Sequence, residues 1–357
     1  MNLLKLPLLN KNIISIDIGS YEVKIIEAKK RNNLIHVNKA FSVLTPEGSY
    51  EDGYIKNEKI LSKVIRDEIK KNRITSRTAY LTIKSTDIIT REIQLPLVEP
   101  KEISGMLKFQ LTEYLPMDIS RYEVQYKIIG RVYNREKGKH NVLIVAIPKD
   151  IVEKHYFLLT GLKLKPEVLD YQSNSISKLI RFSNIINEDV FILGKTIVAI
   201  DLGFNNTNVS IIKDGKLQMS RTIEIGGEIL DKNILNLFNF TKEELVEKKL
   251  NIEDVSRIIG NYSDYNRLIN VTKNTFESII KKLENIIKYY ISKDIENEIN
   301  MILLYGGLSQ ISGVDKLLSN YFNIETTVLN NLNKISIQAN PNKYFNCIST
   351  LIRDEEV

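Results

Sequence analysis

Cysteine, tryptophan and histidine are scarce in this sequence. Its 357 residues include one cysteine, no tryptophan and three histidines. The single Cys347 cannot form an internal disulfide, which indicates a reducing compartment, and we expect it in the core. The histidines His36, His140 and His155 lie far apart and lack the spacing of zinc ligands, so no zinc site is expected.

Long apolar runs are also missing. No stretch of about 18 apolar residues occurs, so no transmembrane helix is expected. The leucine-rich start, Met1–Lys11, is interrupted by Lys5 and Pro7 and lacks the features of a signal peptide. We expect this arm to pack on the body of the protein. The sequence therefore predicts a cytoplasmic protein, for which any association with a membrane would have to be made through a partner.

Neither sign of charge dominates the chain. The formal net charge is +6, with 43% hydrophobic and 26% charged residues, as in ordinary globular proteins. The densest basic run, Lys70, Lys71, Arg73 and Arg77, has no aromatic residues between its charges, and we interpret it as a solvated helix end. No nucleic-acid partner is therefore expected. Separately, a chain of 357 residues exceeds what one core usually supports, which favours two lobes.

A strand that ends in Asp-x-Gly occurs twice. Ile14–Gly19 delivers Asp17 to the end of an apolar strand, and Val198–Gly203 delivers Asp201 in the same way. Each copy continues into two further extended runs, 23–28 and 34–43 in the first and 209–212 and 216–225 in the second. Asp214-Gly215, between the last two runs, is typical of a hairpin turn. The sequence therefore predicts two copies of one β-unit.

Helical periodicity follows each copy. It predicts helices over 57–72, 226–238, 271–293, 312–321 and 341–353, and further strands over 79–84, 300–305 and 325–329. Thr241 with Glu244 forms a capping-box pattern that opens another helix.

The stretch 87–166 does not fit the repeat. Its pattern is β-α-β-β-α, with strands over 87–95, 122–133 and 139–147 and helices over 100–115 and 149–159. We predict an α/β protein of two duplicated lobes around a cleft, with this α+β subdomain inserted in the first lobe. The predicted segments are 1–86 (first lobe), 87–166 (insertion), 167–194 (return to the first lobe), 195–335 (second lobe) and 336–357 (a C-terminal helix on the first lobe).

The two Asp-x-Gly turns carry the residue types of a phosphate site. Glycine lets an anion approach the backbone N–H groups, as at Gly19 and Gly203. Ser20 adds a hydroxyl, and Lys24 can return toward the phosphates from the next strand. In the second copy the short polar donors are Asn205, Asn206 and Thr207.

Two aspartates in one cleft repel each other unless a cation lies between them. For Asp17 and Asp201, Mg²⁺ held largely through water is the natural cation beside phosphates. Gly306-Gly307, after a third apolar strand, offers backbone on which a flat base can lie. Taken singly, each of these turns is more commonly structural, and only the duplication favours a binding site.

The segments taken together resemble the phosphate and adenosine loops of the actin, Hsp70 and sugar-kinase superfamily. Longer stretches resemble the PilM family, cytoplasmic actin-like proteins of type IV pilus assembly. These stretches are SIDIGSYEVKIIEAKK, EIQLPLVEPKEISGMLKFQLTEYLPMDISRYEVQYKIIG and TIEIGGEIL. The FtsA cell-division family shares the insertion, but its members end in an amphipathic membrane helix, whereas this chain ends in the acidic Ile352–Val357.

The resemblance implies an actin-like ATPase fold with ATP and Mg²⁺ as ligands. It assigns Asp17, Gly19, Ser20 and Lys24 to the first phosphate loop, Asp201, Gly203, Asn205, Asn206 and Thr207 to the second, and Gly306, Gly307 and Leu308 to the adenosine loop. Asp17 and Asp201 would hold Mg²⁺ through water. Lys249 matches the lysine of the superfamily's Ala-Glu-x-x-Lys helix, but the alanine and glutamate are Leu245 and Val246 here. This change removes an expected ribose contact unless Glu243 or Glu247 replaces it.

For hydrolysis, the resemblance leaves Gln172 and Asn174 as candidates to orient a water, although both also suit the start of a helix. Slow ATP hydrolysis, or none easily measured, is expected.

The implied partner is the cytoplasmic N-terminal tail of a PilN-like inner-membrane protein, with other pilus motor components and self-association as further options. The apolar stripe of helix 100–115 either forms one wall of the partner site or only packs on its own sheet; it consists of Ile103, Met106, Leu107, Leu111 and Tyr114. An FtsA-like division protein and a small-molecule kinase are the alternative functions.

Overall fold

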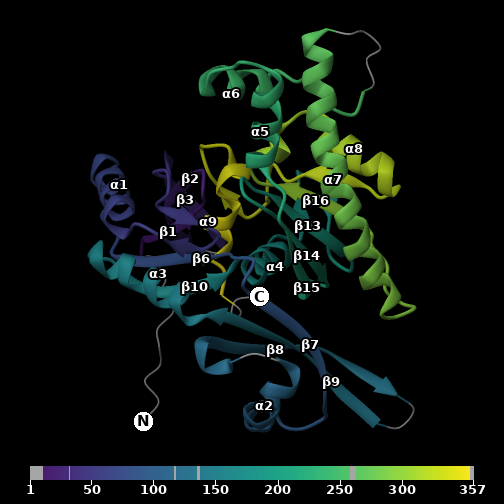
Figure 1. The fold of residues 1–357 in the computed structure, drawn as a ribbon. Coiled ribbons are helices and arrows are strands. Elements are labelled where there is room, and N and C mark those ends of the chain that lie inside the picture. The colour runs from purple at the N-terminus through teal and green to yellow at the C-terminus, as the bar shows by residue number, and fades with distance from the viewer. Residues whose placement is uncertain (1–10, 32, 116–117, 135–136, 258–262, 354–357) are drawn as a thin grey trace.

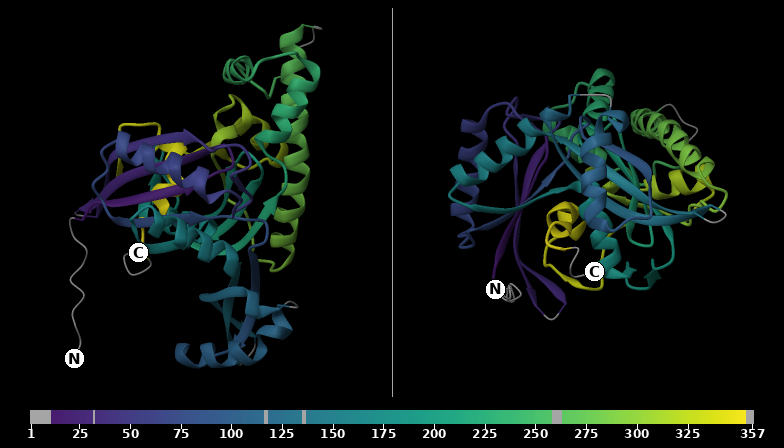
Figure 2. Two further views of the ribbon diagram at one scale, coloured as in Figure 1. Left: turned by 60° about the vertical axis from the view of Figure 1, so that its left-hand side comes forward. Right: turned by 90° about the horizontal axis from the view of Figure 1, so that it is seen from below.

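The computed structural model describes residues 11–31, 33–115, 118–134, 137–257 and 263–353 (Figure 1). Most of the leucine-rich arm and the last four residues lie outside this range. Two lobes stand side by side, and a smaller subdomain lies below them (Figures 1 and 2). Among the described residues, no helix is both long and apolar enough to cross a membrane.

The sheets of the two lobes repeat one strand order. The first has the order β10-β6-β1-β2-β3-β18 and the second β17-β16-β13-β14-β15, so their first five strands correspond one to one. The first sheet comprises β1 (Ile13–Ile18), β2 (Glu22–Arg31), β3 (Leu34–Leu44), β6 (Thr78–Ile83), β10 (Lys165–Tyr171) and β18 (Ile335–Ser336). The second comprises β13 (Thr196–Leu202), β14 (Thr207–Lys213), β15 (Lys216–Ile223), β16 (Met301–Tyr305) and β17 (Thr326–Val328). This topology confirms the predicted duplication.

Register places the two aspartates in equivalent positions. In the first sheet Asp17 lies opposite Lys24 of β2 and Thr82 of β6. In the second, Asp201 lies opposite Asn208 of β14 and Tyr305 of β16. The central strand of each lobe therefore delivers its carboxylate to the same end of its sheet.

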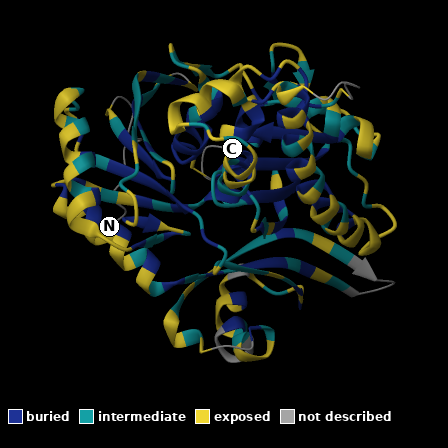
Figure 3. Cartoon of the chain, turned by 45° about the horizontal axis from the view of Figure 1, so that its top comes forward, coloured by how far each residue is buried: buried dark blue, intermediate teal, exposed yellow. Residues whose placement is uncertain are grey.

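Helices separate and cover the sheets in layers. Helices α4 (Gln172–Ser183) and α9 (Phe345–Ser349) lie between the sheets and share one apolar core with both. Helices α1 (Glu58–Lys71) and α3 (Lys149–Gly161) pack on the far face of the first sheet, while α5 (Gly227–Leu237), α7 (Asp264–Ser292) and α8 (Val314–Phe322) pack on the second. Figure 3 shows this pattern as dark central strands between outer helices with exposed yellow faces.

The inserted subdomain has a three-stranded sheet of order β7-β9-β8. It consists of β7 (Ile89–Pro96), α2 (Pro100–Tyr114), β8 (Tyr122–Asn134) and β9 (Lys137–Pro148). Ile103 and Leu107 of α2 are buried against this sheet, so the apolar stripe packs on its own subdomain. Helix α3, although it falls within 87–166, packs on the first-lobe sheet through Ile151 and Leu158. The segment boundaries themselves stay a prediction.

Two helix limits predicted from the sequence are wrong. Helix α7 begins at Asp264, before the predicted Val271, because the Ser263 hydroxyl accepts a hydrogen bond from Asn266 N–H and caps the helix. The predicted helix 341–353 is instead a 3₁₀ turn, Pro341–Tyr344, followed by the short α9. The hydroxyls of Ser349 and Thr350 donate back to carbonyls of α9, a local alternative to continued helix.

Candidate functional site

A cavity of about 220 Å³ lies between the two lobes. It is lined by both Asp-x-Gly turns, the turn after β16, the β4–β5 hairpin (Tyr50–Glu51 and Tyr54–Ile55) and helices α5 and α6 (Lys242–Leu250). Ten residues predicted from the sequence line it: Gly19, Ser20, Lys24, Asp201, Gly203, Asn205, Asn206, Lys249, Gly307 and Leu308. Segments distant in the sequence therefore converge on one cleft.

The first turn joins β1 to β2 tightly. Gly19 N–H donates to the Glu22 carbonyl at 3.1 Å, and a Cβ on Gly19 would lie 2.9 Å from that same oxygen. Glycine is therefore required by close backbone approach. Ser20 is the next residue and faces the cavity.

The second turn repeats this arrangement. Gly203 N–H donates to the Asn206 carbonyl at 3.1 Å, and a Cβ on Gly203 would lie 2.7 Å from it. Asn206 also donates from Nδ2 to Asp52 Oδ1 of the first lobe at 3.2 Å, a hydrogen bond across the cleft. Thr207 does not line the cavity, because it is buried and its hydroxyl donates to the Ile225 carbonyl.

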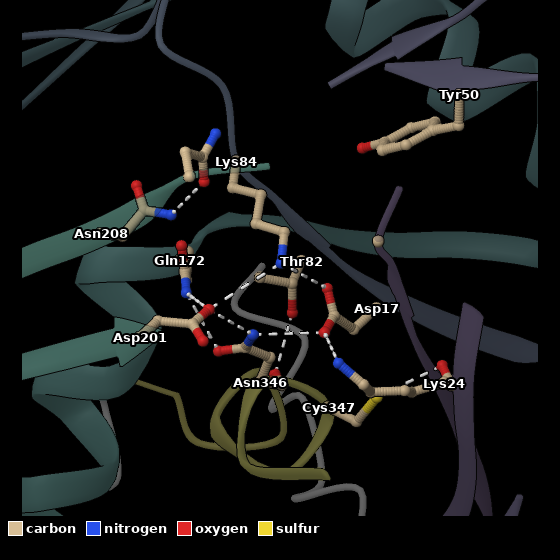
Figure 4. A network of polar contacts seen from close by, with 12 residues as sticks. Asp17, Lys24, Tyr50, Thr82, Lys84, Gln172, Asp201, Asn208, Asn346 and Cys347 are labelled. Carbon is tan, nitrogen blue, oxygen red and sulfur yellow. Dashed lines mark hydrogen bonds and ion pairs between the residues drawn. The ribbon is translucent and has the colours of Figure 1, made fainter. Parts of the chain in front are cut away.

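Asp17 and Asp201 point toward each other between the lobes (Figure 4); Asp201 lines the cavity, whereas Asp17 is fully buried beneath it and does not. The Asn346 amide of α9 donates from Nδ2 to Asp17 Oδ2 at 3.2 Å and to Asp201 Oδ2 at 3.1 Å. Lys84 Nζ lies 3.7 Å from Asp17 Oδ1 and 3.8 Å from Asp201 Oδ2. The cations near these carboxylates are thus lysines of the chain itself.

Lys24 completes the charge balance. Its Nζ lies 3.6 Å from Asp17 Oδ2, which gives two carboxylates and two ammonium groups in one cluster. Burial raises the pKa of Asp17, but the ammonium groups of Lys84 and Lys24 and the Asn346 amide outweigh it and hold this pKa below its ordinary value. Asp17 is therefore an anion although it is fully buried.

The turn after β16 depends on a glycine that does not itself face the cavity. Gly306 has φ +89°, and a Cβ there would lie 2.1 Å from Asp201 Oδ1. A Cβ on Gly307 would meet no atom within 4 Å, and Gly307 lines the cavity together with Leu308. Gly306 is closely packed, and Gly307 is the glycine of this pair whose backbone is open to the cavity.

Helix α6 presents Lys249 to the cavity beside a carboxylate from another helix. Lys249 Nζ lies 2.5 Å from Oδ1 of Asp231 on α5. Burial raises the pKa of Asp231, and the neighbouring Lys249 opposes that shift. Asp231 lines the cavity on the side where Val246 replaces the glutamate of the superfamily motif.

The two residues considered for hydrolysis differ in position. Gln172, the first residue of α4, donates from Nε2 to Asp201 Oδ2, and its Oε1 is buried without a partner among the described residues. Asn174 instead donates to Asp170 Oδ1 at 2.9 Å, and neither Gln172 nor Asn174 lines the cavity. Only Gln172 contacts the aspartate pair.

Sequence reasoning missed Lys84, Asn346, Asp231 and Asp52. Lys84 directly follows a buried strand, and that position in the second lobe carries the glycine pair, so comparing the two copies would have singled it out. Asn346 and Asp231 lie in helices with no motif around them, and no sequence signal marks them.

Buried oxygen atoms for which the described structure holds no hydrogen-bond partner make the site suitable for a Mg²⁺–nucleotide complex. Asp17 Oδ1, Gln172 Oε1 and Asn205 Oδ1 are buried and lack hydrogen-bond partners among the described residues. Within those residues, no three His, Cys, Asp or Glu side chains form a metal cluster. Magnesium beside phosphates commonly takes only one or two carboxylates and keeps its waters, so two aspartates satisfy its needs.

Comparison with known proteins gives consistent results. The cell division protein FtsA of Staphylococcus epidermidis is 25% identical over 252 residues, which cover 64% of this chain and 52% of FtsA. The matched region therefore spans about half the length of that relative.

Solved structures share the fold. A PilM–PilN type IV pilus biogenesis complex superposes with TM-score 0.77 at 17% identity, covering 95% of this chain and 97% of that one. MreB5 of Spiroplasma citri bound to ADP superposes with TM-score 0.53 at 12% identity, covering 96% and 95%. Residues 15–346 match the sequence model of the type IV pilus assembly protein PilM. The chain therefore belongs to the PilM family of actin-like type IV pilus assembly proteins.

Proposed function

We propose that this protein binds ATP between its lobes and, in that state, holds the cytoplasmic tail of a PilN-like inner-membrane protein. The observation that carries the nucleotide part is the convergence of both Asp-x-Gly turns and the Gly307–Leu308 turn on one cavity. The fold is shared with MreB5, whose structure was solved with ADP.

The phosphates would lie between the two turns. Backbone N–H groups around Gly19 and Gly203, together with Ser20 and Asn205, offer donors from both lobes. Asp17 and Asp201 would hold Mg²⁺ through water, and the metal would supply positive charge to the phosphates. The adenosine would lie on Gly307–Leu308, against the half of the cavity formed by α6.

Asp231 is proposed as the ribose contact that α6 lacks. It lines the cavity, and Lys249 positions its carboxylate at 2.5 Å. A carboxylate accepts hydrogen bonds from ribose hydroxyls, as the glutamate of the superfamily motif does. The contact therefore comes from α5 rather than from Glu243 or Glu247.

Titration calorimetry with ATP and Mg²⁺ tests this site. Lys249→Met should weaken ATP binding about tenfold, because it removes the partner that positions Asp231 and a charge-assisted donor. Lys248→Met, one residue away on the exposed face of α6, removes the same charge outside the cavity and should bind like wild type. Failure of the wild-type protein to bind ATP would refute the proposal.

Hydrolysis, if it occurs, is assigned to Gln172 rather than Asn174. Gln172 contacts Asp201 and keeps an unpartnered Oε1 that can accept a hydrogen bond from a water. The side chain is fixed by Asp201 and sits in the cluster between the lobes, so slow turnover is expected.

The partner site is proposed on the inserted subdomain. Strand β8 is an edge strand of its sheet in the described structure, and its Val124, Tyr126 and Ile128 are only partly buried beside α2. An edge strand next to apolar side chains can accept an extended peptide by strand addition. The similar structure of a PilM–PilN complex supports a PilN-like partner.

Neighbouring residues on β8 give a matched test. Val124→Asp places a charge on the apolar side next to α2 and should abolish calorimetric binding of a synthetic PilN-like N-terminal tail peptide. Gln125→Asp adds the same charge on the opposite, exposed side and should leave binding intact. Equal loss in both variants would place the peptide elsewhere.

A further inference from the structure

Lys84 is a charged residue of the cleft that neither the duplication nor the phosphate-loop motifs account for. Pairing of β1 with β6 aligns Asp17 with Thr82, and pairing of β13 with β16 aligns Asp201 with Tyr305. Lys84 thus occupies the position that Gly307 has in the second lobe. The first lobe therefore carries a lysine where the second has bare backbone.

The lysine bridges the two lobes. It belongs to the first, yet its Nζ lies 3.8 Å from Asp201 Oδ2 of the second and 3.7 Å from Asp17 Oδ1. Figure 4 shows its side chain descending between the two aspartates. Lys24, by contrast, forms an ion pair with Asp17 alone among the ion pairs of the described residues.

The β4–β5 hairpin packs against the segment that carries Lys84. A Cβ on Gly53 would lie 2.6 Å from the Lys84 carbonyl, so the hairpin backbone touches this residue directly. Asp52 of the same hairpin accepts hydrogen bonds from the Thr86 N–H at 3.0 Å and from the Thr86 hydroxyl at 2.5 Å. The position of Lys84 is therefore fixed by backbone packing and by hydrogen bonds.

We propose that the Lys84 ammonium is the resident cation of the nucleotide-free cleft and takes the place that a divalent metal would otherwise occupy between Asp17 and Asp201. Two consequences follow. The protein without nucleotide has no Mg²⁺ site, and metal-free ATP still meets a cation at the floor of the cleft. The second consequence rests on the proposed ATP binding, whereas the first does not.

Thermal unfolding with Mg²⁺ alone tests the first consequence. Wild-type protein should show no change in midpoint on adding MgCl₂. Lys84→Met leaves two carboxylates with only Lys24, so Mg²⁺ should bind and raise the midpoint by about 2 °C at a roughly tenfold excess over its dissociation constant. Lys84→Arg keeps the charge and should behave like wild type.

Lys56→Met is the matched control. It removes one lysine charge from the same lobe, and Lys56 pairs with the exposed Glu51 outside the cavity. This variant should not respond to Mg²⁺. If Mg²⁺ alone stabilises the wild-type protein, the assignment of Lys84 is wrong. The assignment is also wrong if wild type and Lys84→Met respond equally to Mg²⁺. If Lys84→Met does not fold, Lys84→Gln takes its place in the comparison.

Calorimetry with ATP separates this assignment from the proposed function. With EDTA present, Lys84→Met should bind ATP at least about tenfold more weakly than wild type, and Mg²⁺ should restore most of the loss. If neither protein binds ATP while only Lys84→Met responds to Mg²⁺, the lysine assignment stands and the nucleotide proposal fails. If both bind ATP and both depend equally on Mg²⁺, the lysine assignment fails and the nucleotide proposal stands.

Discussion

His155 makes the stability of the first lobe depend on pH. Its ring is fully buried on α3, behind the cleft residue Tyr50. Nδ1 lies 2.7 Å from the Ile151 carbonyl, which can only accept, so Nδ1 carries the proton and donates. Nε2 is then the acceptor for the Tyr50 hydroxyl at 3.3 Å. A second proton on Nε2 would remove this acceptor and bury a charge.

The magnitude follows from the pKa of His155. Burial lowers it from 6.5 to about 4, so below pH 6.5 the unfolded chain binds a proton that the folded protein does not. The stabilising contribution is therefore complete above pH 6.5 and is lost as the pH falls toward 4. From about pH 7.5 to about pH 4.5, His155 alone should lower the free energy of unfolding by about 2.5 kcal/mol.

Urea denaturation across this pH range measures the effect. Other groups also titrate, so the quantity of interest is the difference between wild type and His155→Leu. The variant should be less stable at neutral pH, because it loses two hydrogen bonds, but its stability should fall by about 2.5 kcal/mol less on acidification. A fall of the same size in both proteins would show that His155 is not held neutral in the fold.

Two further predictions concern the cleft. Gly306→Ala should lower the free energy of unfolding by at least about 2 kcal/mol in urea denaturation, because φ is +89° and the new Cβ would lie 2.1 Å from Asp201 Oδ1. Gly307→Ala is the control: its Cβ would enter open space, so it should lower the free energy of unfolding by less than about 1 kcal/mol. Asp201→Ala should weaken Mg²⁺–ATP binding. In calorimetric titrations of the partner-tail peptide, ATP should change the binding free energy of the peptide by about 1–2 kcal/mol in wild type and by less in Asp201→Ala. If ATP shifts peptide affinity equally in both proteins, nucleotide at this site is not coupled to the partner.

The features that could be predicted from the sequence are those with a local pattern. Alternation and apolar runs located the strands that carry Asp17 and Asp201, and the repeated Asp-x-Gly related the two lobes. The Asp214-Gly215 turn has φ of 52° and 68°, as a two-residue hairpin turn requires. The capping box of Thr241 and Glu244 is formed as expected. Each of these depends on residues within a few positions of one another.

The parts that could not be predicted depend on contacts between distant segments. Asn346 reaches both aspartates only because α9 returns between the sheets after the second lobe is complete. The sequence indicated a cation between the aspartates but could not show that Lys84 provides it, since strand register decides where that side chain points. Asp231 approaches Lys249 only through the packing of α5 on α6, so its place in the cavity had no signal in the sequence.

These long-range contacts also indicate how the cleft and the inserted subdomain can influence each other. Lys293 at the end of α7 forms an ion pair with Glu92 of β7, and Arg221 of β15 donates to the Thr90 hydroxyl of the same strand at 3.3 Å. The inserted subdomain is covalently part of the first lobe but touches the second at β7. A change in the angle between the lobes must therefore alter these contacts, and any peptide that favours one arrangement of the subdomain must favour one lobe angle. Under the proposed function, coupling between nucleotide and partner would require no path other than the lobes and this contact, and it would act equally in both directions.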